Sequence, residues 1–89
     1  MRIEPNPSVM HRRLADRMVL IHLQTNDIFD LSETSARLWD LLPHDGEIAA
    51  LEEQLAQEFE VDAAQLHREV AETLTTFSRN DLISGYDPS

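Results

Sequence analysis

The amino-acid sequence predicts an α+β fold, in which a three-stranded antiparallel sheet is followed by three helices in a winged-helix-like arrangement. Up to Leu31, short runs of β-branched and large apolar residues alternate with turn-forming residues, as in a meander of strands. From Ser32 onward, apolar residues instead recur every three or four positions, which is the helical period. Apolar residues make up 42% of the 89 residues, enough for a core, so we expect a single domain over residues 1–89.

The first two strands are predicted at Ser8–Leu14 and Arg17–Leu23, on either side of a tight turn at Ala15-Asp16. An extended lead-in at Glu4–Pro7 precedes them, because proline restricts its own φ and the residue before it. Alternation along the second strand puts three residues on each face: Val19, Ile21 and Leu23 on one, and Met18, Leu20 and His22 on the other. Both faces are largely apolar, which favours the central position in the sheet.

A third, short strand is predicted at Ile28–Leu31, after a turn over Gln24–Asp27. In a meander this strand lies at an edge of the sheet, unless the first strand or the N-terminus pairs beside it. Asp27 and Asp30 place charge along that edge, and edge charge is a known deterrent to pairing between copies of a protein. We therefore expect an open edge strand with a protective charge pattern.

Three helices are predicted to follow. Ser32 is a suitable N-cap for the first, which Pro43 ends. The second has an apolar stripe at helical spacing, made up of Ile48, Leu51, Leu55 and Phe59. The third is expected to begin with a capping box over Asp62–Gln65 and to end near Asn80, before Leu82-Ile83 docks back. Its apolar face consists of Ala63, Leu66, Val70, Leu74 and Phe77.

The charge of the chain restricts its partners. The formal net charge is −10, with seven arginines and no lysine. The segment from Asp45 to Glu72 has one arginine, Arg68, against nine acids: Asp45, Glu47, Glu52, Glu53, Glu58, Glu60, Asp62, Glu69 and Glu72. Such a surface repels nucleic acid and anionic membrane, so we expect neither as a partner and favour a neutral or basic peptide or protein. Without an apolar run of about 20 residues or a signal-peptide core, a cytoplasmic location is expected.

The residue patterns predict neither catalysis, nor a metal, nor a cofactor. The four histidines, His11, His22, His44 and His67, lack metal-site spacing, although His11 and His22 could meet across the first hairpin. There is no cysteine, no nucleophile elbow around Ser32, Thr34 or Ser35, and no phosphate loop. A winged-helix DNA-binding regulator is the alternative from another class, but the last helix lacks a basic stripe. An acyl carrier is a poor match because the first third is rich in strands.

With these residues in view, the chain resembles the PqqD-like proteins. The resemblance lies in the ordered set "RMVLIHLQTNDIFDLSETSARLWDLL", an acidic helix, "FEVDAAQL" and a last helix ending in "NDLI". It covers about Ser8 to Ile83, and no one motif in it is diagnostic. The chain departs from the family pattern where Asn26, Ser32 and Ser35 replace a turn glycine, a strand-end asparagine and a helix glycine. Each replacement keeps the local mechanism, since asparagine tolerates positive φ and serine both caps and is small.

The resemblance implies a RiPP recognition element, a non-catalytic protein that binds the leader of a ribosomally made precursor peptide. It is most like the stand-alone leader-binding subunit of lasso-peptide biosynthesis, with a PqqD-type peptide chaperone of quinone cofactor biosynthesis as the alternative. Implied partners are the leader, a leader peptidase and a ring-forming macrolactam enzyme. In this family the leader adds as a strand beside the third strand and lies against the last helix. Carried onto this sequence, the peptide-binding residues are Asp27, Ile28, Phe29, Asp30, Leu31, Glu69, Val70, Thr73, Leu74 and Phe77.

Overall fold

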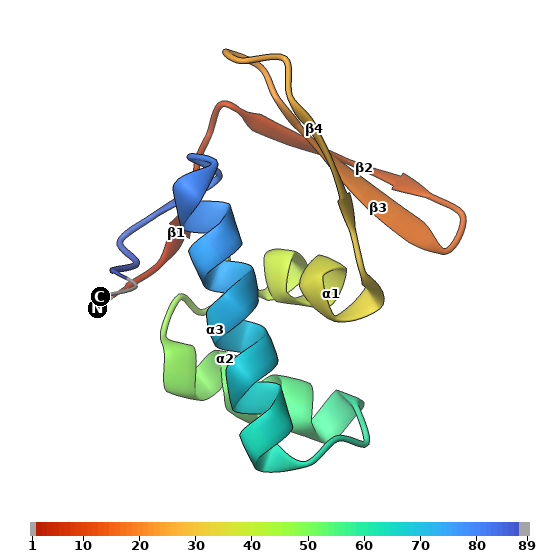
Figure 1. Ribbon diagram of the computed structural model, residues 1–89, viewed down its shortest axis with the longest axis vertical. Coiled ribbons are helices and arrows are strands. Elements are labelled where there is room, and N and C mark those ends of the chain that lie inside the picture. Colours follow the sequence, from red (N-terminus) through yellow and green to blue (C-terminus); the bar gives the residue numbers. More distant parts are fainter. Residues whose placement is uncertain (1, 88–89) are drawn as a thin grey trace.

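A computed structural model describes residues 2–87 and contains a sheet of three strands, a separate pair of short strands and three helices (Figure 1). The elements, in chain order, are β1 (Glu4–Pro5), β2 (Val9–Leu14), β3 (Arg17–His22), β4 (Ile28–Leu31), α1 (Glu33–Leu41), α2 (Ile48–Glu58), α3 (Ala63–Arg79) and β5 (Ile83–Ser84). The predicted α+β arrangement of three antiparallel strands and three helices is confirmed. Within residues 2–87, no helix has both the length and the apolar character needed to cross a membrane.

The main sheet has the order β2-β3-β4, with β3 in the centre as predicted. Ala15, in the hairpin turn between β2 and β3, has a positive φ of 53°. On β3 the side chains of Met18, Leu20 and His22 are buried, whereas Val19 and Ile21 on the other face are half-buried. The helices therefore cover one face of the sheet, and Figure 1 shows the sheet lying across α1 and beside the end of α3.

The switch from strand to helix at Ser32 occurs as the sequence predicts. The Ser32 hydroxyl accepts a hydrogen bond from the Ser35 N–H at 3.2 Å, which satisfies a backbone donor in the first turn of α1. Farther along α1, Trp39 is buried and meets Phe77 of α3 edge to face, with 5.8 Å between ring centroids. The Ser32 cap therefore fixes the start of α1 directly after β4, and the Trp39–Phe77 contact fixes α1 against α3.

The apolar face of α3 is confirmed for four of its five predicted residues, which are buried at helical spacing: Leu66, Val70, Leu74 and Phe77. Ala63, the first residue of the helix, is exposed. Asp62 caps the helix by accepting from the Ala64 N–H at 3.2 Å. The predicted capping box is half right. Gln65 bonds instead to Glu69, one turn farther along, at 3.3 Å, since that carboxylate lies four residues away on the same helix face.

The lead-in segment pairs with the end of the chain, which the sequence did not indicate. β1 and β5 are antiparallel, with Glu4 opposite Ser84 and Pro5 opposite Ile83. Ile3 is fully buried, and its N–H donates to the Gly46 carbonyl at 2.9 Å. A Cβ on Gly46 would collide with the Ile3 carbonyl oxygen, so the close approach of these two segments requires glycine. Because β1 pairs with β5, neither of these strands pairs with the free edge of β4.

Candidate functional site

The candidate site begins at the free edge of β4. Within the described residues β4 pairs with β3 alone, with Ile28 opposite Ile21 and Leu31 opposite Met18. The His22 N–H donates to the Asp27 carbonyl at 3.0 Å, and bonded pairs alternate along an antiparallel ladder. Phe29 and Leu31 therefore direct their backbone groups toward β3, while Ile28 and Asp30 direct theirs away from the sheet. These outward N–H and C=O groups form a template for another strand.

A groove lies between this edge and the C-terminal half of α3. Its volume is about 460 Å³, and its lining consists of Ile28, Phe29, Asp30, Leu31, Ser35, Glu72, Thr73, Thr76, Phe77 and Leu82. Phe77 and Leu82 are buried and make an apolar floor, whereas Glu72 and Thr76 are exposed at the rim. The groove thus combines apolar surface with a polar border, as small-molecule and peptide sites commonly do.

The groove continues toward the start of α1. A second hollow of about 270 Å³ shares Ser35, Glu72 and Thr73 with the groove and is also lined by Ser32, Thr34 and Glu69. The hydroxyls of Ser35 and Thr73 lie 3.3 Å apart and connect α1 with α3 where the two hollows meet. The carboxylates of Glu69 and Glu72 give this end a negative charge.

The two predicted aspartates lie in β4 and in the turn before it. Asp30 forms an ion pair with Arg17 of β3, and both side chains are more than half exposed. Asp27 lies in the turn before β4, where its N–H donates to the Thr25 hydroxyl at 3.3 Å. The negative charge of Asp30, which also lines the groove, is therefore partly neutralised within the chain, whereas Glu69 and Glu72 form no ion pair among the described residues.

The structure brings most of the predicted binding residues to this region. Ile28, Phe29, Asp30, Leu31, Thr73 and Phe77 line the groove, and Glu69 lines its continuation. Val70 and Leu74 have exposed fractions of 2% and 0% and belong to the core, where they border a different hollow beside Tyr86. Whether any of these residues contacts a peptide stays a prediction.

Sequence reasoning missed four residues of the groove: Ser35, Glu72, Thr76 and Leu82. A signal for two of them was present. Glu69, Glu72, Thr73 and Thr76 recur at helical spacing and form a polar stripe beside the apolar face of α3. A stripe bordering an apolar face is where a groove rim would be expected. Leu82 lies beyond the helix, and only the turn after α3 brings it to the floor.

Among the described residues, no histidine lines the groove, and neither do the groups whose pKa is shifted. The hairpin register places His11 opposite Leu20 and His22 opposite Val9, so the two histidines do not face each other. No group of metal-ligating side chains occurs among residues 2–87. Hydrogen bonds from Arg37 and Gln54 lower the pKa of Glu58, and the Glu58 carboxylate in turn raises the pKa of Arg37. This pair joins α1 to α2 and lines a different hollow from the groove.

Comparison with known proteins gives the family. The family described as coenzyme PQQ synthesis protein D (PqqD) matches residues 17–83. No curated protein matches the chain. A solved structure described as TbiB1 in complex with the TbiA(beta) leader peptide is 26% identical, with a TM-score of 0.86 over 94% of this chain and 98% of that one. A lasso peptide synthetase B1 complexed with the leader peptide is 20% identical, with a TM-score of 0.83 over 96% and 100% of the two chains, and this likeness is one of fold. Because the match covers well over half of its residues, the chain belongs to the PqqD family.

Proposed function

We propose that this chain is a RiPP recognition element that binds the leader of a ribosomally made precursor peptide, of the lasso-peptide type, as one leader-binding domain. The observation that carries the proposal is the unpaired edge of β4 beside a groove that α3 closes on its other side. The solved complex of a 26% identical protein with a leader peptide supports the same reading.

The proposed mechanism is strand addition. The leader pairs with the outward N–H and C=O groups of Ile28 and Asp30, and this pairing supplies affinity independent of leader sequence. Alternate leader side chains then point into the groove, where Phe77 and Leu82 receive apolar anchors. Side chains on the opposite face lie next to Ile28, whose own side chain is 68% exposed.

Charge gives the leader a preferred direction. Glu69 and Glu72 make the α1 end of the groove acidic, so a basic leader residue is favoured there over an acidic one. At the opposite end, the carboxylate of Asp81, which precedes Leu82, already contacts His22 and Asn6. A leader with an apolar anchor and a basic residue therefore fits in one orientation better than in the other.

The proposed role is non-catalytic. Once bound, the leader is held outside the sheet edge, and the part of the precursor that follows it extends into solvent. We propose that a leader peptidase and a ring-forming macrolactam enzyme act on the precursor in this state. Binding by the chain then raises the concentration of precursor near those enzymes, as tethering does in other multiprotein assemblies.

A titration tests the proposal. The probe is a fluorescein-labelled leader peptide from the precursor encoded beside this chain's own gene, measured by fluorescence anisotropy. We expect a dissociation constant in the micromolar range or below, about −8 kcal/mol or more favourable. A scrambled peptide of the same composition is the matched control and should bind at least about tenfold more weakly. Equal binding of the two peptides, or no binding at about 100 µM, would refute leader recognition.

A further inference from the structure

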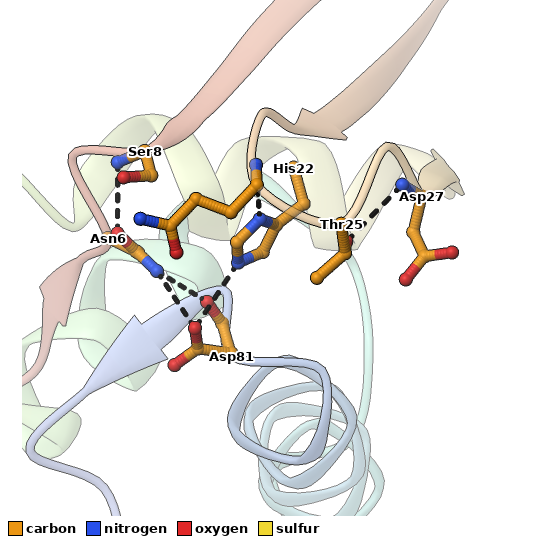
Figure 2. A network of polar contacts seen from close by, with 7 residues as sticks. Asn6, Ser8, His22, Thr25, Asp27 and Asp81 are labelled. Carbon is orange, nitrogen blue, oxygen red and sulfur yellow. Dashed lines mark hydrogen bonds and ion pairs between the residues drawn. The ribbon is translucent and has the colours of Figure 1, made fainter.

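A buried histidine lies at one end of the groove, at the last residue of β3. His22 is fully buried, and its Nδ1 accepts a hydrogen bond from the Gln24 N–H at 3.2 Å. Its Nε2 lies 3.2 Å from an Asp81 carboxylate oxygen. Because Nδ1 is an acceptor, the neutral ring carries its proton on Nε2 and donates it to Asp81. Figure 2 shows the ring between the turn that precedes β4 and Asp81, two residues after the end of α3.

Asp81 has an unfavourable backbone conformation for an aspartate. Its φ is 59°, and it follows Asn80, the C-cap of α3. The Leu82 N–H donates to the Phe77 carbonyl at 2.9 Å and the Asp81 N–H to the Ser78 carbonyl at 3.2 Å, which is the Schellman arrangement. Glycine is the usual residue at this position because it has no Cβ to strain. We therefore expect the side-chain contacts of Asp81 to offset the strain of its backbone.

The side chain and carbonyl of Asp81 join three segments of the chain. His22 reaches the carboxylate from the end of β3, and Asn6 reaches both the carboxylate, at 3.3 Å, and the Asp81 carbonyl, at 2.8 Å. Asn6 also accepts from the Ser8 N–H at 2.9 Å, which fixes the connection into β2 (Figure 2). We call His22, Asp81 and Asn6 the corner network.

The corner network lies one residue from each wall of the groove. On the strand side, the His22 N–H bonds the Asp27 carbonyl, and Ile28 follows at once as the first residue of β4. On the helix side, Asp81 is followed by Leu82, whose side chain lines the groove and whose carbonyl accepts from the Asn6 N–H at 2.9 Å. A hydrogen bond between His22 and Asp81 therefore links the start of β4 to the end of α3.

We propose that His22 and Asp81 are positioning residues that hold β4 and α3 at the spacing a peptide strand needs. This inference rests on the proposed leader binding. Without the link, the core beneath still joins the start of β4 to α3, but part of the binding free energy goes into ordering the groove. The positioning role then explains why this position, where glycine would favour the fold, has an aspartate with a strained backbone.

Two substitutions of the same residue separate positioning from stability. Asp81→Gly relieves the left-handed conformation but removes the acceptor of the buried His22 Nε2–H, and these opposing effects should leave the melting temperature little changed. We expect about tenfold weaker binding of the labelled leader. Asp81→Asn tolerates positive φ and keeps an acceptor for the His22 Nε2–H, so binding should stay within about twofold of the wild type. Rescue by asparagine is not expected if the charge of Asp81 alone attracts the leader.

The matched control is Asp62→Ala, which removes a carboxylate and a capping bond from the other end of the same helix. It should lower the melting temperature and leave leader affinity within about twofold, because Asp62 lines neither the groove nor its continuation. If Asp81→Gly does not fold, Asn6→Ala takes its place in the test. It should lower leader affinity about threefold, because it removes the Asn6 hydrogen bonds from the corner network.

The ligand-free protein gives a separate readout. In Asp81→Gly, but not in Asp62→Ala, the backbone amide resonances of both groove walls should shift, at Ile28–Leu31 and at Thr73–Phe77. Failure of the wild-type chain to bind any leader would refute the proposed function, and these resonances would still test the link. Wild-type affinity in Asp81→Gly, unshifted wall resonances, or a binding loss in Asp62→Ala that equals the loss in Asp81→Gly would overturn the positioning role.

Discussion

Replacing Ile28 by proline tests whether a peptide pairs with the edge of β4. The Ile28 side chain is 68% exposed, so its loss leaves no cavity in the core. Its N–H points away from β3, as the alternation from the His22–Asp27 bond requires, so proline leaves the β3–β4 ladder intact. Edge strands tolerate proline when the missing N–H faces outward. We expect the free energy of unfolding to fall by less than about 1 kcal/mol.

The expected effect on binding follows from one lost donor. A backbone hydrogen bond contributes about 1 kcal/mol net, and a leader carbonyl left without a partner in the complex costs about 1–3 kcal/mol. With about 1.4 kcal/mol for each factor of ten, affinity should fall roughly five- to hundredfold. Ile28→Ala removes the same exposed side chain and keeps the N–H, so its affinity should stay within about threefold of wild type.

Anisotropy titration of the labelled leader gives the affinities, and urea unfolding confirms that each variant is folded at the binding temperature. Phe29→Pro provides a contrast, because the Phe29 N–H faces β3 and its loss should destabilise the sheet itself. Equal affinities for Ile28→Pro and Ile28→Ala would refute backbone pairing at β4, whatever the affinity of the wild-type chain.

Three further predictions concern the groove, the core and an ion pair. Thr73→Phe should fill the groove and weaken leader binding more than about tenfold in the titration, while circular dichroism stays unchanged. Leu74→Ala should cost about 2–5 kcal/mol of unfolding free energy in urea, because Leu74 is fully buried, whereas Leu23→Ala, at a 54% exposed position, should cost less than about 1 kcal/mol. Arg37 lowers the pKa of Glu58, so the ion pair stabilises the fold above the ordinary carboxyl value of 4.5 and this stabilisation is lost as pH falls through the lowered pKa. Glu58→Gln should therefore cost at most about 1 kcal/mol at pH 7, since the pair is partly exposed, and nothing in acid below that pKa; an undiminished difference there would contradict the assignment.

Features set by neighbouring residues could be predicted from the sequence. The short strand at Ile28–Leu31 and the cap at Ser32 depend on local alternation, turn residues and a side-chain oxygen within one turn of the helix. The predicted boundaries of these elements agree with the structure for that reason. The capping box over Asp62–Gln65 was wrong at Gln65, because its amide can either accept from the Asp62 N–H or donate to Glu69, and the sequence does not rank the two.

Features that join distant residues could not be predicted in this way. The pairing of β1 with β5 and the bond from His22 to Asp81 connect positions far apart in the chain, and no local sequence pattern predicts either. Helical spacing likewise put Val70 and Leu74 in the same stripe as Phe77. Only the course of α3 past β4 determines that Phe77 reaches the groove, whereas the other two lie in the core.

The central claim is strand addition at β4, and residue-resolved amide hydrogen exchange with and without the labelled leader tests it most directly. The N–H groups of Ile28 and Asp30 face the free edge and should exchange rapidly in the unbound chain. Leader binding should slow both by at least about tenfold, while Phe29 and Leu31, whose amides already bond to β3, should change far less. Saturating leader that leaves the exchange of Ile28 and Asp30 unchanged would contradict the account.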